Sequence, residues 1–392
     1  MKGHDSLNGT SSPSPFASPV RKDEGGLSSA ADDSTAHDAD ASMPAHWLIR
    51  LAPGVGQREL RAMVEDLRLR GHETSFAELG AGLVVVDRLG REELEDILAS
   101  QGEFVEALVA VDTPERLVRR DALPGGSVVH IGDVPFGGTH FPVIAGPCAV
   151  ENRSQMLASA HAASVAGVDI LRGGAFKPRT SPYAFQGLGI RGIELLVEAR
   201  RATGLPFVTE VLDPASVERM YAHVDAFQVG ARNMQNFELL KALGDIDKPV
   251  LLKRGPSSQL RDWLLAAEYL LAGGNHRVIL CERGVQGFND RTRFTLDLAT
   301  MALAKRETHL PVIVDPSHAT GDPNLVIPMA CAALAAGADG VMVEFHPDPS
   351  EALSDGPQAL VPSAVEDLMD RLAKIAPGVG RRVGRPVPAG TT

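Results

Sequence analysis

From residue 141 onward, one pattern of apolar and polar positions repeats along the chain. A short apolar run, typical of a buried strand, is followed by a polar or glycine-rich stretch and then by apolar residues at helical spacing. The predicted strands are 143–145, 169–171, 206–208, 226–229, 250–252, 278–280, 312–314 and 340–343, and predicted helices include 154–166, 193–202, 263–271, 325–336 and 364–375.

Eight strand-plus-helix units within residues 141–376 predict an α/β fold, the (β/α)8 TIM barrel. In this fold the active site lies on the loops that follow the carboxyl ends of the strands. A doubly wound open sheet is the main alternative. We favour the barrel because an open sheet rarely places polar residues after every strand.

Residues 45–118 follow a different pattern and predict a small accessory domain. Strand-like and helical stretches alternate in an order close to βαββαβ, which suits a ferredoxin-like fold. The strand-like runs are 47–51, 81–86 and 105–111, and the helical stretches are 57–70 and 92–98.

Residues 119–140 form the predicted linker, with a β-hairpin. Apolar runs at 128–131 and 141–144 flank the turn residues 132–138. The two ends of the chain, 1–44 and 377–392, contain few large apolar side chains and cannot bury enough surface to offset the entropy of ordering. We expect a disordered N-terminal tail and a flexible C-terminal one.

The composition restricts the class of protein. Its formal net charge is −12, and it lacks a basic helix or a basic run interleaved with aromatic residues, so we expect neither nucleic acid nor an anionic membrane as partner. Three cysteines cannot all be paired, and the sequence shows no secretory or membrane-spanning apolar segment. We therefore expect a cytoplasmic enzyme with small-molecule partners.

Charged or reactive side chains follow the predicted strands, although turn geometry alone would favour Asn, Asp, Ser and Gly there. Because cations are gathered at one end of the barrel in an acidic chain, we predict a site for phosphate-bearing substrates. These cations are Arg172, Lys177, Arg179, Arg232, Lys253 and Arg283.

Five segments carry a resemblance to a known family. They are Gly-Pro-Cys-Ala-Val-Glu at 146–151, residues 171–183, residues 230–236, Asp-Pro-Ser-His-Ala-Thr-Gly at 315–321 and Ser-Asp-Gly-Pro-Gln at 354–358. From about residue 46 to about 376 the chain resembles 3-deoxy-D-arabino-heptulosonate 7-phosphate (DAHP) synthases, and most closely the subclass with an N-terminal ferredoxin-like domain. The resemblance implies a transferase that condenses phosphoenolpyruvate with erythrose 4-phosphate in the shikimate pathway.

The resemblance also implies a divalent metal held by Cys148, His318, Glu344 and Asp355. A thiolate, an imidazole and two carboxylates suit Mn, Fe, Co or Zn better than Mg or Ca. The metal would act as a Lewis acid toward the aldose aldehyde. We expect Asp315 and His346 to orient the ligands, as residues next to a metal site commonly do.

The remaining roles are also implied by the resemblance. Lys177 would donate a proton to the aldehyde oxygen, and Glu210 or Glu282 would either position the attacking water or pair with nearby cations. We expect Arg191, Arg254 and Arg261 to be exposed surface charges. Phosphoenolpyruvate would contact Arg172, Lys177, Arg232, Lys253, Arg283 and the backbone of Ala231, and the aldose phosphate would contact Lys177, Pro178, Arg179 and Thr180.

Residues 190–191, 254–259 and 284–288 depart from the family pattern, which leaves the acceptor aldose open. 3-Deoxy-D-manno-octulosonate 8-phosphate synthase is one alternative, disfavoured by Lys177-Pro178-Arg179 and by the N-terminal domain. A non-catalytic amino-acid sensor is another. In the resembling subclass the N-terminal domain mediates feedback inhibition by tyrosine or phenylalanine, so an aromatic amino acid is a candidate effector, and a homotetramer is the expected assembly.

Overall fold

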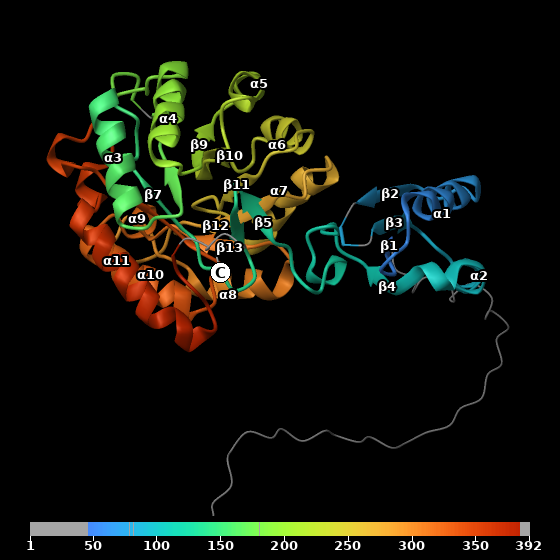
Figure 1. The fold of residues 1–392 in the computed structure, drawn as a ribbon. Helices are drawn as coiled ribbons and strands as arrows, with labels where there is room; N and C mark the ends of the chain where they lie inside the picture. Colours follow the sequence, from blue (N-terminus) through green and yellow to red (C-terminus); the bar gives the residue numbers. More distant parts are fainter. Residues whose placement is uncertain (1–45, 78, 81, 180, 385–392) are drawn as a thin grey trace, which may run out of the picture. The chain divides into compact units, whose positions relative to one another are not determined.

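The computed structural model describes residues 46–384, except 78, 81 and 180 (Figure 1). The predicted N-terminal tail, 1–44, lies outside these residues. Within the described part, a small antiparallel sheet is followed in the chain by a β-hairpin and a closed barrel of eight strands. None of the described helices has the length and apolar character needed to span a bilayer.

The small sheet has the βαββαβ order that the sequence predicts. Its order is β2-β3-β1-β4, with antiparallel pairing throughout. Four side chains at helical spacing on α1, Leu60, Met63, Val64 and Leu67, are buried in the core of this region. The elements are β1 (His46–Leu51), α1 (Gln57–Leu69), β2 (Thr74–Ala77), β3 (Leu83–Asp87), α2 (Arg91–Gln101) and β4 (Val105–Val111).

The barrel confirms the predicted fold, because eight parallel strands close in sequence order from β7 to β14. The strands are β7 (Val143–Gly146), β8 (Ile170–Arg172), β9 (Phe207–Val211), β10 (Ala226–Val229), β11 (Val250–Lys253), β12 (Val278–Glu282), β13 (Val312–Val314) and β14 (Val341–Glu344). Almost every strand residue is buried on both faces, as parallel strands require.

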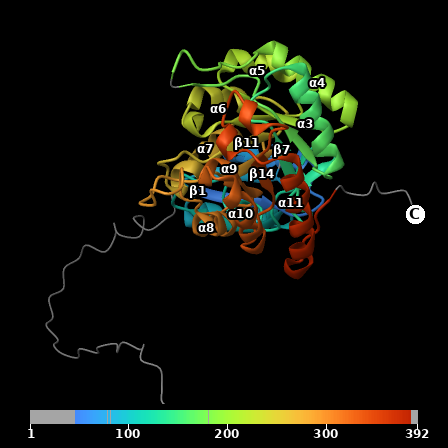
Figure 2. The same ribbon diagram turned by 90° about the vertical axis from the view of Figure 1, so that its left-hand side faces the viewer.

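Helices surround the strands (Figures 1 and 2). A short additional helix, α9 (Pro316–Thr320), follows β13 directly and carries one of the predicted metal ligands. The others are α3 (Arg153–Val165), α4 (Ile190–Thr203), α5 (Pro214–Tyr221), α6 (Phe237–Gly244), α7 (Leu260–Ala272), α8 (Leu298–Glu307), α10 (Pro323–Ala335) and α11 (Pro362–Ile375).

The hairpin differs from the prediction. β5 (Val129–Ile131) pairs with β6 (Val134–Phe136) across the two-residue turn Gly132-Asp133, whereas residues 141–144 lead into the first barrel strand. The prediction was wrong about the second strand because Gly132, at φ +58°, already supplies the left-handed turn. Apolar side chains of the hairpin pack with residues from all eight barrel strands, so the hairpin covers one end of the barrel interior.

The described part of the predicted C-terminal tail, residues 377–384, is docked on the barrel domain. Arg382 exchanges backbone hydrogen bonds with Thr139 and Phe141, at 2.9 and 2.8 Å. The guanidinium of Arg381 lies 2.9 Å from the buried carboxylate of Asp339. The composition did not predict this docking, because the contacts are made by two arginines in a glycine-rich segment. Residues 385–392 lie outside the described part.

Candidate active site

A polar cavity of about 130 Å³ lies where the barrel strands end. Arg172 and Lys253 are the last residues of β8 and β11, and Arg283 follows β12 directly. Residues of β9 and β10 and the loops after several strands add the remaining walls. The lining residues are Arg172, Lys177, Pro178, Arg179, Glu210, Gln228, Gly230, Ala231, Arg232, Lys253, Pro256, Arg283, Arg293, Phe294, His318 and Asp355.

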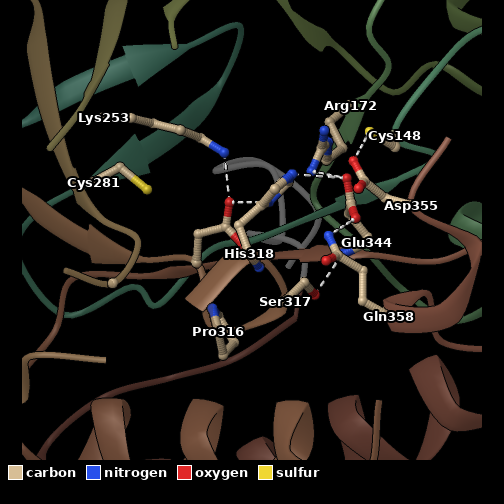
Figure 3. A network of polar contacts seen from close by, with 12 residues as sticks. Cys148, Arg172, Lys253, Cys281, Pro316, Ser317, His318, Glu344, Asp355 and Gln358 are labelled. Carbon is tan, nitrogen blue, oxygen red and sulfur yellow. Dashed lines mark hydrogen bonds and ion pairs between the residues drawn. The ribbon is translucent and has the colours of Figure 1, made fainter. Parts of the chain in front are cut away.

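The four predicted metal ligands come together from three separate loops. One donor atom each from Cys148, His318, Glu344 and Asp355 lies within 4.8 Å of the other three. Cys148 follows β7, His318 lies on α9, and Glu344 ends β14, with Asp355 in the loop beyond it. Figure 3 shows these side chains turned toward one another. Asp355 has a left-handed backbone conformation (φ +56°), which is uncommon for a residue other than glycine.

His318 is oriented by Asp315. The imidazole Nδ1 lies 2.7 Å from Asp315 Oδ2, and the same carboxylate oxygen accepts a 2.5 Å bond from Lys253 Nζ. Although burial alone would lower it, the carboxylates of Asp315 and Glu344 raise the pKa of His318 to about 9. Because Nδ1 is occupied, Nε2 is left facing the cluster, an arrangement common among metal-binding histidines.

Glu344 presents its Oε1 to the cluster. Its Oε2 accepts a 2.5 Å bond from Gln358 Nε2, and its backbone N–H donates to Ser317 Oγ. Its Oε1 lies 3.1 Å from both Arg172 Nη1 and His318 Nε2, yet has no hydrogen-bond partner among the described residues. Burial opposes ionisation, but these cations hold the pKa of Glu344 well below its usual range.

Cys148 is held next to Lys177. The ammonium Nζ lies 2.9 Å from the sulfur and 3.0 Å from the carbonyl oxygen of Cys148. Burial lowers the pKa of Lys177, but the nearby Cys148 and Glu210 outweigh it and raise the pKa overall. Gly146 permits the close approach of β7 to β8, since a Cβ there would lie 2.1 Å from the carbonyl oxygen of Arg172.

The other predicted binding residues lie around this cluster. Arg283 is buried, which lowers its pKa, and its guanidinium lies 4.5 Å from the centre of the Phe294 ring. Arg232 and Arg179 are more exposed and line the cavity with Pro178 and Ala231. Thr180 lies outside the described residues.

The two predicted water-positioning candidates differ in location. Glu210 lines the cavity, whereas Glu282 is not among its described lining residues. The carboxylate of Glu282 accepts from Arg254 Nη1 at 2.9 Å and from the backbone N–H of Gly284 at 2.7 Å. Burial, only partly offset by Arg254, raises the pKa of Glu282. Glu282 therefore connects the loop after β11, through Arg254, to the loop after β12, through Gly284.

The prediction that Arg254 is an exposed charge was wrong. Its side chain is 6% exposed and pairs with Glu282 and Asp297, at 2.9 and 3.1 Å. Arg191 and Arg261 are exposed as expected, at 63% and 62%. His346 lies 3.4 Å from Glu151 and accepts a bond from the backbone of Asp348, so its described contacts are away from the four donors.

Sequence reasoning missed Arg293. This arginine lines the cavity, lies 3.4 Å from Asp355 Oδ1 and donates to Gln358 Oε1 at 2.9 Å. It is distant from the end of the preceding strand, so a search of strand ends could not find it. Gln358 lies in the segment 354–358 that carries the family resemblance, but no role was predicted for it.

Comparisons with known proteins identify the family of the chain. The model of the DAHP synthetase I family matches residues 124–376. The chain is 42% identical over 341 residues to the phospho-2-dehydro-3-deoxyheptonate aldolase of Thermotoga maritima, covering 86% of this chain and 99% of that protein. It is 34% identical over 258 residues to the 2-dehydro-3-deoxyphosphooctonate aldolase of Syntrophobacter fumaroxidans, covering 61% of this chain and 88% of that protein.

Two solved structures are similar as well. The crystal structure of the Thermotoga maritima DAHP synthase has a TM-score of 0.68 and 42% identity, covering 86% of this chain and 99% of that one. A truncated form of the DAHP synthase from the same organism has a TM-score of 0.64 and 43% identity, covering 68% of this chain and 98% of the other.

Proposed function

The chain belongs to the DAHP synthetase I family, and from this we propose that its barrel cavity condenses phosphoenolpyruvate with erythrose 4-phosphate. Carbon C3 of the enol attacks the aldehyde carbon, water adds at C2, and inorganic phosphate leaves with cleavage of the C2–O bond. The product is DAHP, the first intermediate of the shikimate pathway. The observation that carries the proposal is a cavity lined by cations directly beside a cluster of four potential metal ligands.

We propose that Cys148, His318, Glu344 and Asp355 hold a divalent metal. Three features favour this: the mutual approach of the four donors, the absence of a hydrogen-bond partner for Glu344 Oε1 among the described residues, and the orientation of His318, whose Nε2 faces that oxygen at 3.1 Å while Nδ1 is bonded to Asp315. The mixed sulfur, nitrogen and oxygen set suits Mn, Fe, Co or Zn. A bound ion of this kind supplies Lewis acidity toward the aldehyde oxygen. The free thiol of Cys148 fits a reducing cytoplasm.

The cations bind and orient the two anionic substrates. Arg172, Lys253 and Arg283 are buried at the strand ends, where the low dielectric strengthens their attraction for phosphate and carboxylate. Arginine forks match two oxygens at once, whereas lysine acts as a movable point charge. Arg232 and the backbone of Ala231 complete the proposed phosphoenolpyruvate site.

The acceptor is proposed to enter past the loop after β8. Pro178, Arg179 and Thr180 would hold the aldose phosphate, with its aldehyde directed toward the cluster. Lys177 lies beside Cys148, so its ammonium can donate a proton to the aldehyde oxygen as the carbon–carbon bond forms. Glu210 is the better placed of the two carboxylates to orient the water, because it lines the cavity.

A panel of aldose phosphates tests the reaction. Phosphoenolpyruvate and Mn²⁺ are supplied with erythrose 4-phosphate, arabinose 5-phosphate or ribose 5-phosphate, and the loss of enol absorbance is followed. We expect erythrose 4-phosphate to be consumed fastest. Preference for arabinose 5-phosphate would instead identify a 3-deoxy-D-manno-octulosonate 8-phosphate synthase, and no turnover with any aldose would favour the non-catalytic sensor.

Regulation and assembly are part of the same proposal. We propose that the ferredoxin-like region binds an aromatic amino acid and that the enzyme is a homotetramer, on the strength of the subclass resemblance. Inhibition by tyrosine and phenylalanine should therefore be lost when residues 1–113 are deleted. Equal inhibition of the full and shortened chains would remove the regulatory role, and light scattering would measure the assembly.

A further inference from the structure

Arg293 and Gln358 form a chain of contacts beside the four-donor cluster that the reaction described above does not use. We propose that Arg293 is a positioning residue for the metal site, which holds Asp355 directly and Glu344 through Gln358 and so raises the affinity of the cluster for a divalent cation. The inference rests on the proposed metal site. It adds a residue that lies far from any strand end along the sequence.

The contacts run from one guanidinium to two of the four donors. Nη1 of Arg293 lies 3.4 Å from Asp355 Oδ1 and donates to Gln358 Oε1 at 2.9 Å. Nε2 of Gln358 then donates to Glu344 Oε2 at 2.5 Å. A single arginine is therefore connected both to Asp355 and, through the Gln358 amide, to Glu344.

The backbone around Arg293 is fixed to the helix that carries His318. The N–H of Arg293 donates to the carbonyl of Thr320 at 2.9 Å, and the N–H of Phe294 donates to that of Ala319 at 2.7 Å. A Cβ at Gly321 would lie only 2.8 Å from Cβ of Arg293, so the two segments are in close contact. The position of Arg293 is thus defined relative to α9, and with it to a third donor.

Arg293 and Glu344 together fix the orientation of the buried Gln358 amide. A guanidinium can only donate hydrogen bonds, so the amide oxygen must face Arg293 and the amide nitrogen must face Glu344. In this orientation the amide nitrogen binds Oε2 of Glu344, and Oε1 faces Arg172 and His318 in the cluster. Without the arginine, only Glu344 holds the Gln358 amide, so the side chain is less firmly placed and positions Glu344 less well.

Two effects of Arg293 on a divalent cation oppose each other. Its positive charge repels the ion, but its side chain is 34% exposed, so solvent screens this repulsion. Its positioning effect acts on two ligands through short contacts. Loss of groups that orient metal ligands commonly weakens metal binding by about 10–100-fold. We therefore expect the positioning effect to dominate.

The test compares Mn²⁺ affinity without substrates, by electron paramagnetic resonance of the free ion, in the full-length chain. Arg293→Met and Gln358→Met should each weaken binding by about tenfold or more. The double variant should lose much less than the product of the two single losses, because the residues act in one chain of contacts. Arg291→Met is the matched control, since Arg291 is 91% exposed, lies on the same loop and removes the same charge.

Unchanged or tighter Mn²⁺ binding by a folded Arg293→Met variant would overturn the inference, and so would an equal loss in Arg291→Met. Independent, multiplicative losses in the double variant would overturn the link through Gln358. If Arg293→Met does not fold, Arg293→Lys takes its place: it keeps a cation but not the guanidinium, and it should weaken binding measurably.

Failure of the wild-type chain to bind Mn²⁺, Co²⁺ or Zn²⁺ would overturn the metal site and the inference together. Tight metal binding without turnover of any aldose phosphate would count against the proposed reaction alone.

Discussion

Replacement of Arg254 by methionine should destabilise the barrel strongly. The side chain is 6% exposed and neutralises Glu282, which is fully buried, and Asp297, which is 24% exposed. Methionine keeps the apolar stem but leaves Glu282 with no cationic partner and with only two described side-chain hydrogen bonds, from the backbone N–H groups of Gly284 and Asp297 at 2.7 and 3.5 Å. Removal of one partner of a buried ion pair typically costs about 3–5 kcal/mol.

For a domain of the size of this barrel, each kcal/mol changes Tm by about 2–4 °C, so a fall of roughly 6–20 °C is expected. Thermal unfolding followed by circular dichroism measures it. The loss should be smaller at low pH, because burial raises the pKa of Glu282 and removal of Arg254 allows that carboxyl group to take up a proton. The second substitution Glu282→Gln should restore part of the stability, because it removes the unpaired charge.

Arg191→Met is the control, since its side chain is 63% exposed and it pairs with Glu194, which is 57% exposed. Exposed pairs of this kind contribute about 0–1 kcal/mol. The reasoning is refuted if the Tm of Arg254→Met is close to that of Arg191→Met, or if Glu282→Gln fails to raise the Tm of the Arg254→Met chain.

Three further predictions concern the metal ligand Cys148, the binding of phosphoenolpyruvate and the buried His309. Cys148→Ser should lose bound metal and turnover together, measured by equilibrium dialysis and enol absorbance; full activity without metal would contradict the assignment. Phosphoenolpyruvate at a hundred times its Kd, with metal, should stabilise the fold by about 2.7 kcal/mol, seen as a rise in Tm that an inactive sugar phosphate does not produce. Burial lowers the pKa of His309 to about 4, whereas an unfolded histidine has a pKa of about 6.5. Between these two pH values the unfolded chain binds one proton more than the folded chain. The free energy of unfolding should therefore fall by up to about 3 kcal/mol as the pH is lowered from about 6.5 toward 4. The urea midpoint of His309→Gln should depend less on pH in this range than that of the unchanged chain. Equal pH dependence in both chains would contradict the prediction.

The barrel could be predicted from the sequence because each strand and helix has its own local pattern. The four potential ligands could be proposed because of the family resemblance: Cys148, His318 and Asp355 lie in the segments that carry it, and Glu344 directly follows a predicted strand. Arg254 and Arg293 could not be placed in this way. Whether an arginine is exposed or buried depends on carboxylates such as Asp297 and Asp355, which are brought close only by the folding of separate loops.

The hairpin and the C-terminal segment show a second limit of the sequence. Two apolar runs were available to pair with residues 129–131, and only the two-residue turn selects 134–136 as the partner. Residues 377–384 lack the apolar side chains that predict docking, yet backbone hydrogen bonds and Arg381 attach them. Contacts made mainly by the backbone cannot be predicted from the pattern of apolar positions, because every residue other than proline offers the same backbone groups.

Most of the residues that depart from the family pattern do not line the cavity. Pro256 is the only residue from 190–191, 254–259 and 284–288 among the described residues that line the cavity. Two of the other departures contact each other: Ser257 Oγ lies 2.9 Å from Gln286 Oε1, and the backbone N–H of Gln286 donates to the carbonyl of Pro256 at 2.7 Å. Apart from Pro256, these departures therefore join the loops after β11 and β12 and do not face the cavity. Because Pro178 and Arg179 line the cavity, we expect the loop that carries them to decide the choice of acceptor.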